Sequence, residues 1–93
     1  MISKKPLNVA IARDKSLSGS LNGWYKTAAA ADWKNLMEVR QTFPTADFVY
    51  PFTVFNIKGN AYRLVTKIEY RFGQVFVKGV YTHAEYDKGQ WKS

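Results

Sequence analysis

The stretch FTVFNIKGNAYRLVTKIEYRFGQVFVKGVY, residues 52–81, decides the fold of this chain. It is rich in β-branched and aromatic residues, which favour β-strands. Two short turn signals divide it, KGN at residues 58–60 and FGQ at residues 72–74. Two tight turns so close together predict three antiparallel strands that form a meander.

Alternation along these strands sorts the side chains onto two faces of the sheet. One face is apolar and carries Phe55, Ile57, Tyr62, Leu64, Thr66, Ile68, Tyr70, Val75 and Val77. The other face carries Asn56, Lys58, Arg63, Val65, Lys67, Glu69, Arg71, Phe76, Lys78 and Val80. An antiparallel sheet can leave one face in water, so a solvated face with some cations is the simpler interpretation. Five cations and one acid on one face repel one another, which favours a bound anion instead.

The residues before this stretch have helical spacing. Leu7, Ala10 and Ile11 predict a first helix after Pro6, because proline is tolerated in a first turn. A second apolar stripe, with Ser16 or Ser18 as its cap and TAAAADW as its extension, consists of Leu17, Leu21, Trp24, Tyr25 and Ala28. A third short helix is expected from about residue 35 to 43, where Pro44 ends it. The predicted fold class is therefore α+β, with N-terminal helices packed on one face of a small antiparallel sheet.

The bulk composition limits the class of protein. A chain of 93 residues is expected to form one domain, residues 1–93, with a modest core. It has no cysteine, which excludes disulfides and thiolate chemistry and fits a reducing cytoplasm. No apolar run approaches the roughly 20 residues of a membrane span, and the N-terminus does not resemble a signal peptide.

The formal net charge of +7 indicates the kind of partner. A charge so far from zero favours nucleic acid or an acidic protein as the binding partner. A basic protein without any polyanionic partner is the alternative, although the cations are not confined to one tail.

The segment THAEYD, residues 82–87, brings proton-exchanging groups to the end of the third predicted strand. It contains the single histidine, His83, together with Tyr86. RNA can be cut without metal when a base removes the 2′-hydroxyl proton, an acid protonates the leaving 5′-oxygen and a cation stabilises the phosphorane. Arg63, His83 and Tyr86 are of the types that this reaction needs, and arginine binds phosphate in a fork-like manner.

Other chemistry fits the sequence less well. One histidine and no cysteine make a zinc site improbable, and Glu85 and Asp87 are a weak candidate for a divalent ion. There is no nucleophile-elbow motif for a serine triad, and KGN is a turn rather than a phosphate loop. His83 as a surface bystander remains an alternative to His83 as a catalyst.

Four segments in a characteristic order resemble one family. ADW, FPTADFV, VFNIKGNAYRLVTKIEY and THAEYD are similar to the segments of HigB-type toxins of bacterial toxin–antitoxin pairs, across roughly residues 24–87. The resemblance implies a RelE-like fold and an mRNA interferase, a metal-free endonuclease that needs no cofactor and cuts mRNA on the ribosome. It also implies a HigA-type antitoxin with a helix-turn-helix domain, and no membrane partner.

The resemblance also assigns site residues. It implies that Arg63 faces the scissile phosphate, that His83 is a general acid or base, and that Tyr86 orients the 2′-hydroxyl or stacks on a base. Glu85 and Asp87 are expected to position His83 or to cap the chain end. The expected contacts to backbone phosphates are Asn56, Lys58, Lys67, Arg71 and Lys78, while Gly59 and Asn60 shape the turn.

Two positions depart from the family pattern, and two other functions stay open. Tyr81 stands where a small residue is expected, and the second helix is unusually rich in alanine. The first alternative function is a basic module that blocks ribosomal or other RNA without cutting it. The second is a ParE-like poison of DNA gyrase on the same fold, since fold alone does not determine function.

Overall fold

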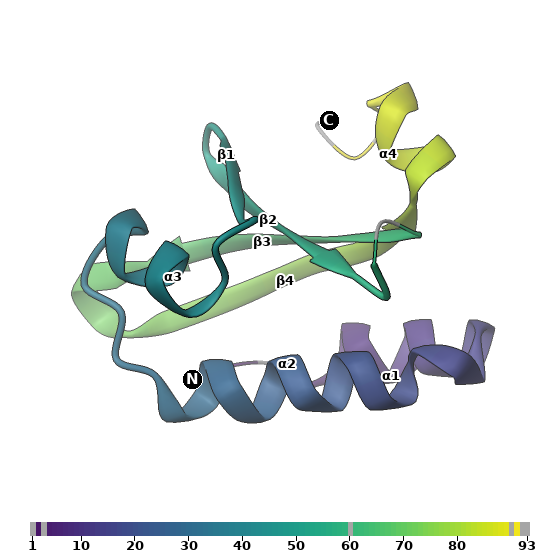
Figure 1. Ribbon diagram of the computed structural model, residues 1–93, viewed down its shortest axis with the longest axis horizontal. Coiled ribbons are helices and arrows are strands. Elements are labelled where there is room, and N and C mark those ends of the chain that lie inside the picture. The colour runs from purple at the N-terminus through teal and green to yellow at the C-terminus, as the bar shows by residue number, and fades with distance from the viewer. Residues whose placement is uncertain (1, 3, 60, 90, 92–93) are drawn as a thin grey trace.

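A computed structural model describes residues 2, 4–59, 61–89 and 91 of the chain. Asn60, expected in the first turn, lies outside these residues. The helical half contains α1 (Lys5–Arg13), a 3₁₀ turn (Lys15–Leu17), α2 (Ser18–Ala30) and α3 (Leu36–Thr42). The second half contains β1 (Asp47–Val49), β2 (Phe52–Ile57), β3 (Tyr62–Glu69), a 3₁₀ turn (Tyr70–Phe72), β4 (Gln74–Thr82) and α4 (His83–Lys88). In Figure 1, α1 and α2 lie along one face of the sheet, while the β1 hairpin and α4 rise from the other.

The helices form where the apolar spacing predicts them. Pro6 lies in the first turn of α1, and Asn35 caps α3 by accepting a hydrogen bond from the Glu38 backbone N–H at 3.0 Å. The predicted serine cap of α2 is wrong, because Leu17 occupies the cap position and no side chain caps this end. The helix also ends at Ala30, before Asp32 and Trp33.

The described residues form one antiparallel sheet with strand order β1-β2-β3-β4. The three-strand meander predicted from the sequence is present as β2, β3 and β4. The prediction omitted β1, a strand of three residues that pairs with the start of β2 through Asp47 and Val54. A strand so short has too few residues to show a period of two.

The helix-covered face holds the main core. Phe55 is its centre, with the rings of Trp24, Phe43 and Trp33 at centroid distances of 5.4, 5.2 and 6.2 Å. Leu21 and Leu64 are fully buried in the same cluster. This packing confirms the predicted apolar face, and aromatic pairs at these distances contribute beyond the area they bury.

A β-bulge changes the alternation in β4. Between Val65 and Thr66 the register shifts, so that Leu64 pairs with Val80 while Thr66 pairs with Val77. Val80 therefore lies on the helix-covered face and packs against the main core. Its predicted place beside Lys78 on the other face is wrong, because a bulge adds one residue and exchanges the faces beyond it.

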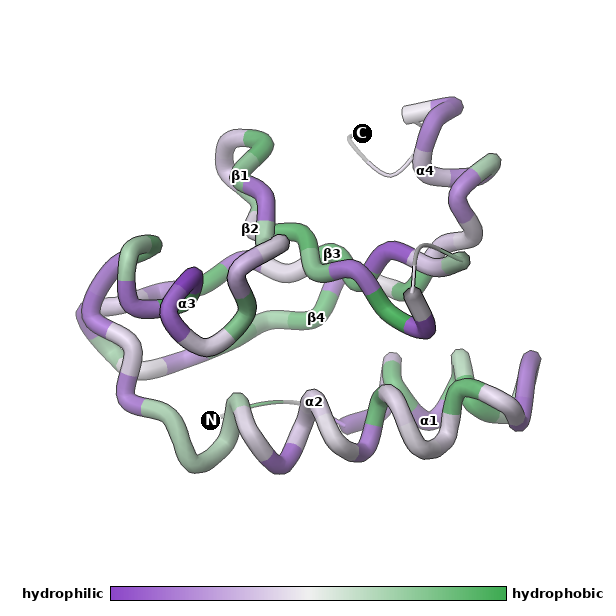
Figure 2. Tube along the Cα trace, viewed as in Figure 1, coloured by the Kyte–Doolittle hydropathy of each residue, from purple (hydrophilic) through white to green (hydrophobic). Residues whose placement is uncertain are grey.

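The second face of the sheet is not an open cationic surface. Val54, Val65 and Trp91 are buried there, with Phe52, Tyr81 and Tyr86 packed around them. Figure 2 shows apolar segments in the sheet strands and a mostly hydrophilic α4 above them. This face therefore holds a small second core, which we call the aromatic cluster (Phe52, Val54, Val65, Tyr81, Tyr86 and Trp91).

Candidate active site

Three side chains form a row across the strands at the end of the sheet near α4. Arg63 on β3 pairs with Asn56 on β2 and with Tyr81 on β4, so all three lie on the second face. Arg63 is half-buried, and its Nη1 donates to the Tyr62 carbonyl at 3.3 Å. Its guanidinium lies over the ring of Tyr86, 5.8 Å from the centroid. The guanidinium is thus held against the sheet rather than extended into water.

Helix α4 is fixed to the sheet by its first turn. Thr82 and Glu85 form a capping box: Thr82 Oγ1 accepts from the Glu85 N–H at 3.1 Å, and Glu85 Oε1 accepts from the Thr82 N–H at 2.9 Å. The His83 backbone N–H donates to the Ala61 carbonyl at 3.1 Å, beside the start of β3. These contacts set the direction in which α4 leaves the sheet. Glu85 therefore closes the cap at the start of α4, whereas the sequence predicted that it positions His83 or caps the chain end.

His83 lies at the exposed start of α4 with a carboxylate partner. Its Nδ1 is 2.8 Å from Asp87 Oδ2, one helical turn later, and 54% of its side chain is exposed. The pair bears out the expectation that Asp87 positions His83. A histidine whose Nδ1 is engaged by a carboxylate has a defined ring orientation and presents Nε2 for proton exchange.

Tyr86 is held in place by an aromatic neighbour, Trp91, that no sequence pattern singles out. The Trp91 ring stacks on it at 4.9 Å with an interplanar angle of 9°, and Trp91 Nε1 donates to the Tyr86 carbonyl at 2.9 Å. Trp91 is only 3% exposed. Burial first, and then the negative charge of Asp47, raises the pKa of Tyr86 above its ordinary value of 10.0. The raised pKa keeps the Tyr86 hydroxyl protonated, and so able to donate a hydrogen bond, over a wider range of pH.

Three of the five predicted phosphate contacts lie on or beside the second face. Asn56 is in the row with Arg63, and Lys67 is exposed on β3 with its Nζ 3.9 Å from Glu69 Oε1. Lys78 lies at the bulge, with its Nζ 5.4 Å from the Phe52 ring centroid. These three surround the aromatic cluster.

The other two predicted contacts point elsewhere, and their placement on the cationic face is wrong. Lys58 follows the last residue of β2 with a left-handed φ of 53°, and its Nζ donates to Ser16 Oγ at 2.6 Å on the helix side. Arg71 lies in the 3₁₀ turn after β3 and over the ring of Phe72. Alternation does not extend past the ends of strands, so it misplaced both residues.

Tyr81, which departs from the family pattern, has room because of a neighbouring glycine. A Cβ on Gly79 would lie 2.9 Å from the Tyr81 hydroxyl oxygen and 3.0 Å from Cζ. The ring therefore lies across Gly79 on the second face and completes one side of the aromatic cluster. Trp91 had no sequence signal beyond being a large aromatic in a polar tail.

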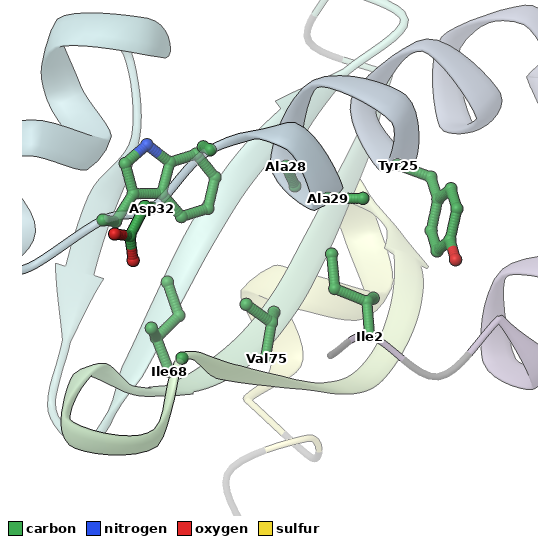
Figure 3. Close-up of a pocket in the computed structure, with 10 residues that line it drawn as sticks. Ile2, Tyr25, Ala28, Ala29, Asp32, Ile68 and Val75 are labelled. Carbon is green, nitrogen blue, oxygen red and sulfur yellow. The ribbon is translucent and has the colours of Figure 1, made fainter.

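A separate hollow lies on the helix-covered side. It has a volume of about 240 Å³ and is lined mainly by apolar side chains of α2, β3 and β4, including Ala28, Ile68 and Val75. Figure 3 shows Tyr25 and Asp32 at its margins. Since Ile68 and Val75 face the helices, this hollow is not part of the Arg63 and His83 site.

Within the described ranges there is no group of three or more His, Cys, Asp or Glu side chains that could hold a metal ion. No helix in the same ranges is both long and apolar enough to cross a bilayer.

Comparison with known proteins identifies the family of this chain. Residues 18–89 match the model of the HigB toxin family, described as the RelE-like toxic component of a toxin–antitoxin system. The chain belongs to the HigB toxin family. It is also 31% identical over 91 residues to mRNA interferase HigB of Escherichia coli O6:H1 strain CFT073, which covers 95% of this chain and 88% of that protein.

Family membership confirms two expectations from the sequence. The helices followed by a four-stranded antiparallel sheet agree with the α+β, RelE-like fold class of HigB toxins. As the toxic component of a toxin–antitoxin system, the protein also has an antitoxin as its partner.

Proposed function

We propose that this HigB-family toxin is an endoribonuclease that cleaves mRNA without a metal ion or cofactor and thereby inhibits translation and growth. The observation that carries the proposal is the meeting of two elements. The start of α4 brings His83 and Tyr86 to the end of the sheet where Arg63 lies. The name of the Escherichia coli relative, mRNA interferase HigB, supports the same activity.

In the proposed reaction, the 2′-oxygen of the RNA attacks the adjacent phosphorus and the bond to the 5′-oxygen breaks. The products are a 2′,3′-cyclic phosphate and a free 5′-hydroxyl. One proton leaves the 2′-hydroxyl and one is delivered to the 5′-oxygen. His83 Nε2 transfers one of these protons, with its ring oriented by Asp87.

Arg63 stabilises charge in the transition state, and Tyr86 orients the RNA. The Arg63 guanidinium stabilises the negative charge that develops on the phosphorane oxygens. The Tyr86 hydroxyl, which is protonated near neutral pH, donates a hydrogen bond that orients the 2′-oxygen or the phosphate. Trp91 already stacks on the Tyr86 ring, which favours this role over stacking of a base.

The RNA contacts and the partners complete the proposal. Asn56, Lys67 and Lys78 contact backbone phosphates from around the aromatic cluster, and Lys58 and Arg71 do so from the sheet ends. The substrate is mRNA on the ribosome in the cytoplasm, and the antitoxin is of the HigA type.

Induced expression with 5′-end mapping of cellular mRNA tests the function. Wild-type toxin is compared with His83→Ala, and the charge-changing variant Lys26→Ala on the exposed side of α2 serves as a control. New 5′ ends within translated regions, present for wild type and Lys26→Ala and absent for His83→Ala, are expected. Growth arrest with intact mRNA in all strains would overturn the proposal in favour of a non-cutting RNA binder, and DNA-damage signalling would favour a gyrase poison.

A further inference from the structure

Two consecutive residues at the end of α1 contact both elements that form the candidate active site. Arg13 is the last residue of α1 and binds α4, while Asp14 follows it and binds the start of β3. Figure 1 shows α1 and α4 at the same end of the sheet. The contacts join residues separated by 72 and 48 positions in the sequence.

Arg13 holds the carboxylate that caps α4. Its Nη1 donates to Glu85 Oε1 at 3.2 Å and its Nη2 donates to Glu85 Oε2 at 3.0 Å. This is the two-point geometry that makes arginine–carboxylate pairs directional. The hydrogen bonds from Arg13 are the main reason that the pKa of Glu85 lies below its ordinary value. Since the same carboxylate closes the capping box, Arg13 fixes the turn that carries His83.

Asp14 holds the strand that carries Arg63. Its Oδ2 accepts from the Tyr62 hydroxyl at 2.7 Å, and its Oδ1 accepts from Ser16 Oγ at 2.6 Å and from the Ser16 N–H at 3.0 Å. The Ser16 hydroxyl, followed by the Tyr62 hydroxyl, lowers the pKa of Asp14 to about 2. Tyr62 immediately precedes Arg63, and its carbonyl accepts from the Arg63 guanidinium.

We propose that Arg13 and Asp14 are positioning residues that hold α4 and the start of β3 in the relative placement that RNA cleavage requires. The proposal rests on the proposed function, because the elements they join carry His83 and Arg63. The match to the family model begins at residue 18, so both residues lie outside the matched region. No sequence pattern singles them out, because an Arg-Asp pair at the end of a helix is also typical of an ordinary solvated terminus.

A purely stabilising role is the alternative, and the structure makes the two roles separable. Leu7 and Ala10 anchor α1 in the main core independently of its last residue. The Arg13–Glu85 pair is itself exposed, and exposed ion pairs contribute little to the free energy of unfolding. Small displacements of reacting groups lower rates strongly, by about a hundredfold for 1 Å. Loss of the contact is therefore expected to change the rate much more than the melting temperature.

The experiment compares Arg13→Ala with Arg13→Lys and with the matched control Lys26→Ala, which loses the same charge from α2. Single-turnover cleavage of mRNA in a purified translation mixture gives the maximal rate constant and the half-saturating toxin concentration. Amide hydrogen exchange of α4, relative to that of β3, gives a second measurement that does not depend on activity. Thermal melting of each purified toxin checks the fold.

For Arg13→Ala we expect a maximal rate constant lowered about ten- to a hundredfold, an unchanged half-saturating concentration, and exchange in residues 83–88 that is faster by severalfold. Arg13→Lys should regain part of the rate, and Lys26→Ala should match wild type. Unchanged exchange in α4, or faster exchange with an unchanged rate, would overturn the proposal. If wild-type toxin cleaves no mRNA, the proposed function fails. Faster exchange of α4 in Arg13→Ala would then show only that Arg13 contacts α4. The positioning role in catalysis would be overturned together with the proposed function.

A double-mutant cycle tests the Asp14 half in the same assay. Asp14→Ala and Tyr62→Phe each remove one side of the 2.7 Å hydrogen bond. If the two residues act through this contact, the double variant should cleave about as slowly as the slower single variant. Multiplication of the two rate losses would show that Asp14 and Tyr62 act independently and would contradict the positioning role of Asp14.

Discussion

Arg63 is the residue on which the proposed chemistry depends most. Its strand neighbours Asn56 and Tyr81 flank it, and Tyr86 lies under its guanidinium. A half-buried arginine in such a setting loses little side-chain freedom when a phosphate binds. Preorganised charge of this kind is most effective where water is partly excluded.

Arg63→Ala should lower the maximal cleavage rate by about 10² to 10³-fold, the cost typical of removing one preorganised donor to a developing oxyanion. Arg63→Lys should recover only part of this loss, because lysine provides a point charge without the planar fork. Single-turnover cleavage of ribosome-bound mRNA measures both variants, with melting temperatures as a check on folding. Full growth inhibition by Arg63→Ala would refute the assigned role.

Helix α4 is the element that decides whether these residues meet. It has six residues, too few to be stable as an isolated helix, so its order comes from its contacts. The capping box fixes its first turn, and Trp91 packs on Tyr86 near its end. Trp91 also contacts Phe52 edge to face at 5.4 Å, which ties α4 to β2. The candidate site is therefore supported from beyond the helix itself.

Trp91→Ala should destabilise the toxin by about 3 kcal/mol, since it removes a buried aromatic side chain and leaves a cavity in the aromatic cluster. It should also lower the cleavage rate, because Tyr86 loses its stacking partner. Trp91→Phe retains a ring and should be milder in both respects. Chemical denaturation and single-turnover cleavage measure the two effects, and wild-type stability in Trp91→Ala would show that the cluster is not a second core.

The elements also show what local sequence patterns determine. The helices α1, α2 and α3 and the strands β2, β3 and β4 follow periods of 3.6 and 2, so their existence was predictable, whereas the short helix α4 was not predicted. Strand β1 is too short for a period, and the bulge beside Val65 depends on cross-strand pairing that no local pattern encodes. Val80 was misplaced for this reason alone.

The candidate site was predictable to a similar extent. Arg63, His83 and Tyr86 were selected by residue type and by resemblance, and the structure places them at one end of the sheet. Lys58 and Arg71 were misplaced because alternation was extended past strand ends. Trp91, Arg13 and Asp14 reach the site through tertiary contacts, so their part could be recognised only in three dimensions.

At the scale of the whole molecule, the net charge of +7 is spread over both halves of the fold. Some cations are engaged by carboxylates, as Arg13 is by Glu85, and others lie around the aromatic cluster. RNA that binds the second face should therefore release counterions only from the phosphates that these cations contact. The number of those contacts is measurable from the dependence of affinity on salt.

Lys67→Ala and Lys78→Ala should each reduce the slope of log affinity against log salt concentration by about 0.7, the value for one phosphate contact on a single strand. Lys26→Ala removes the same charge from α2, on the helix-covered side, and should leave the slope unchanged. Fluorescence anisotropy with a labelled single-stranded RNA, in a His83→Ala background that prevents cleavage, measures all four proteins. If the three lysine variants have equal slopes of log affinity against log salt concentration, the positive charge of the protein acts only as a diffuse field and not through contacts at the second face. A reduction confined to Lys67 and Lys78 would instead assign RNA binding to the second face, where Arg63 and His83 lie.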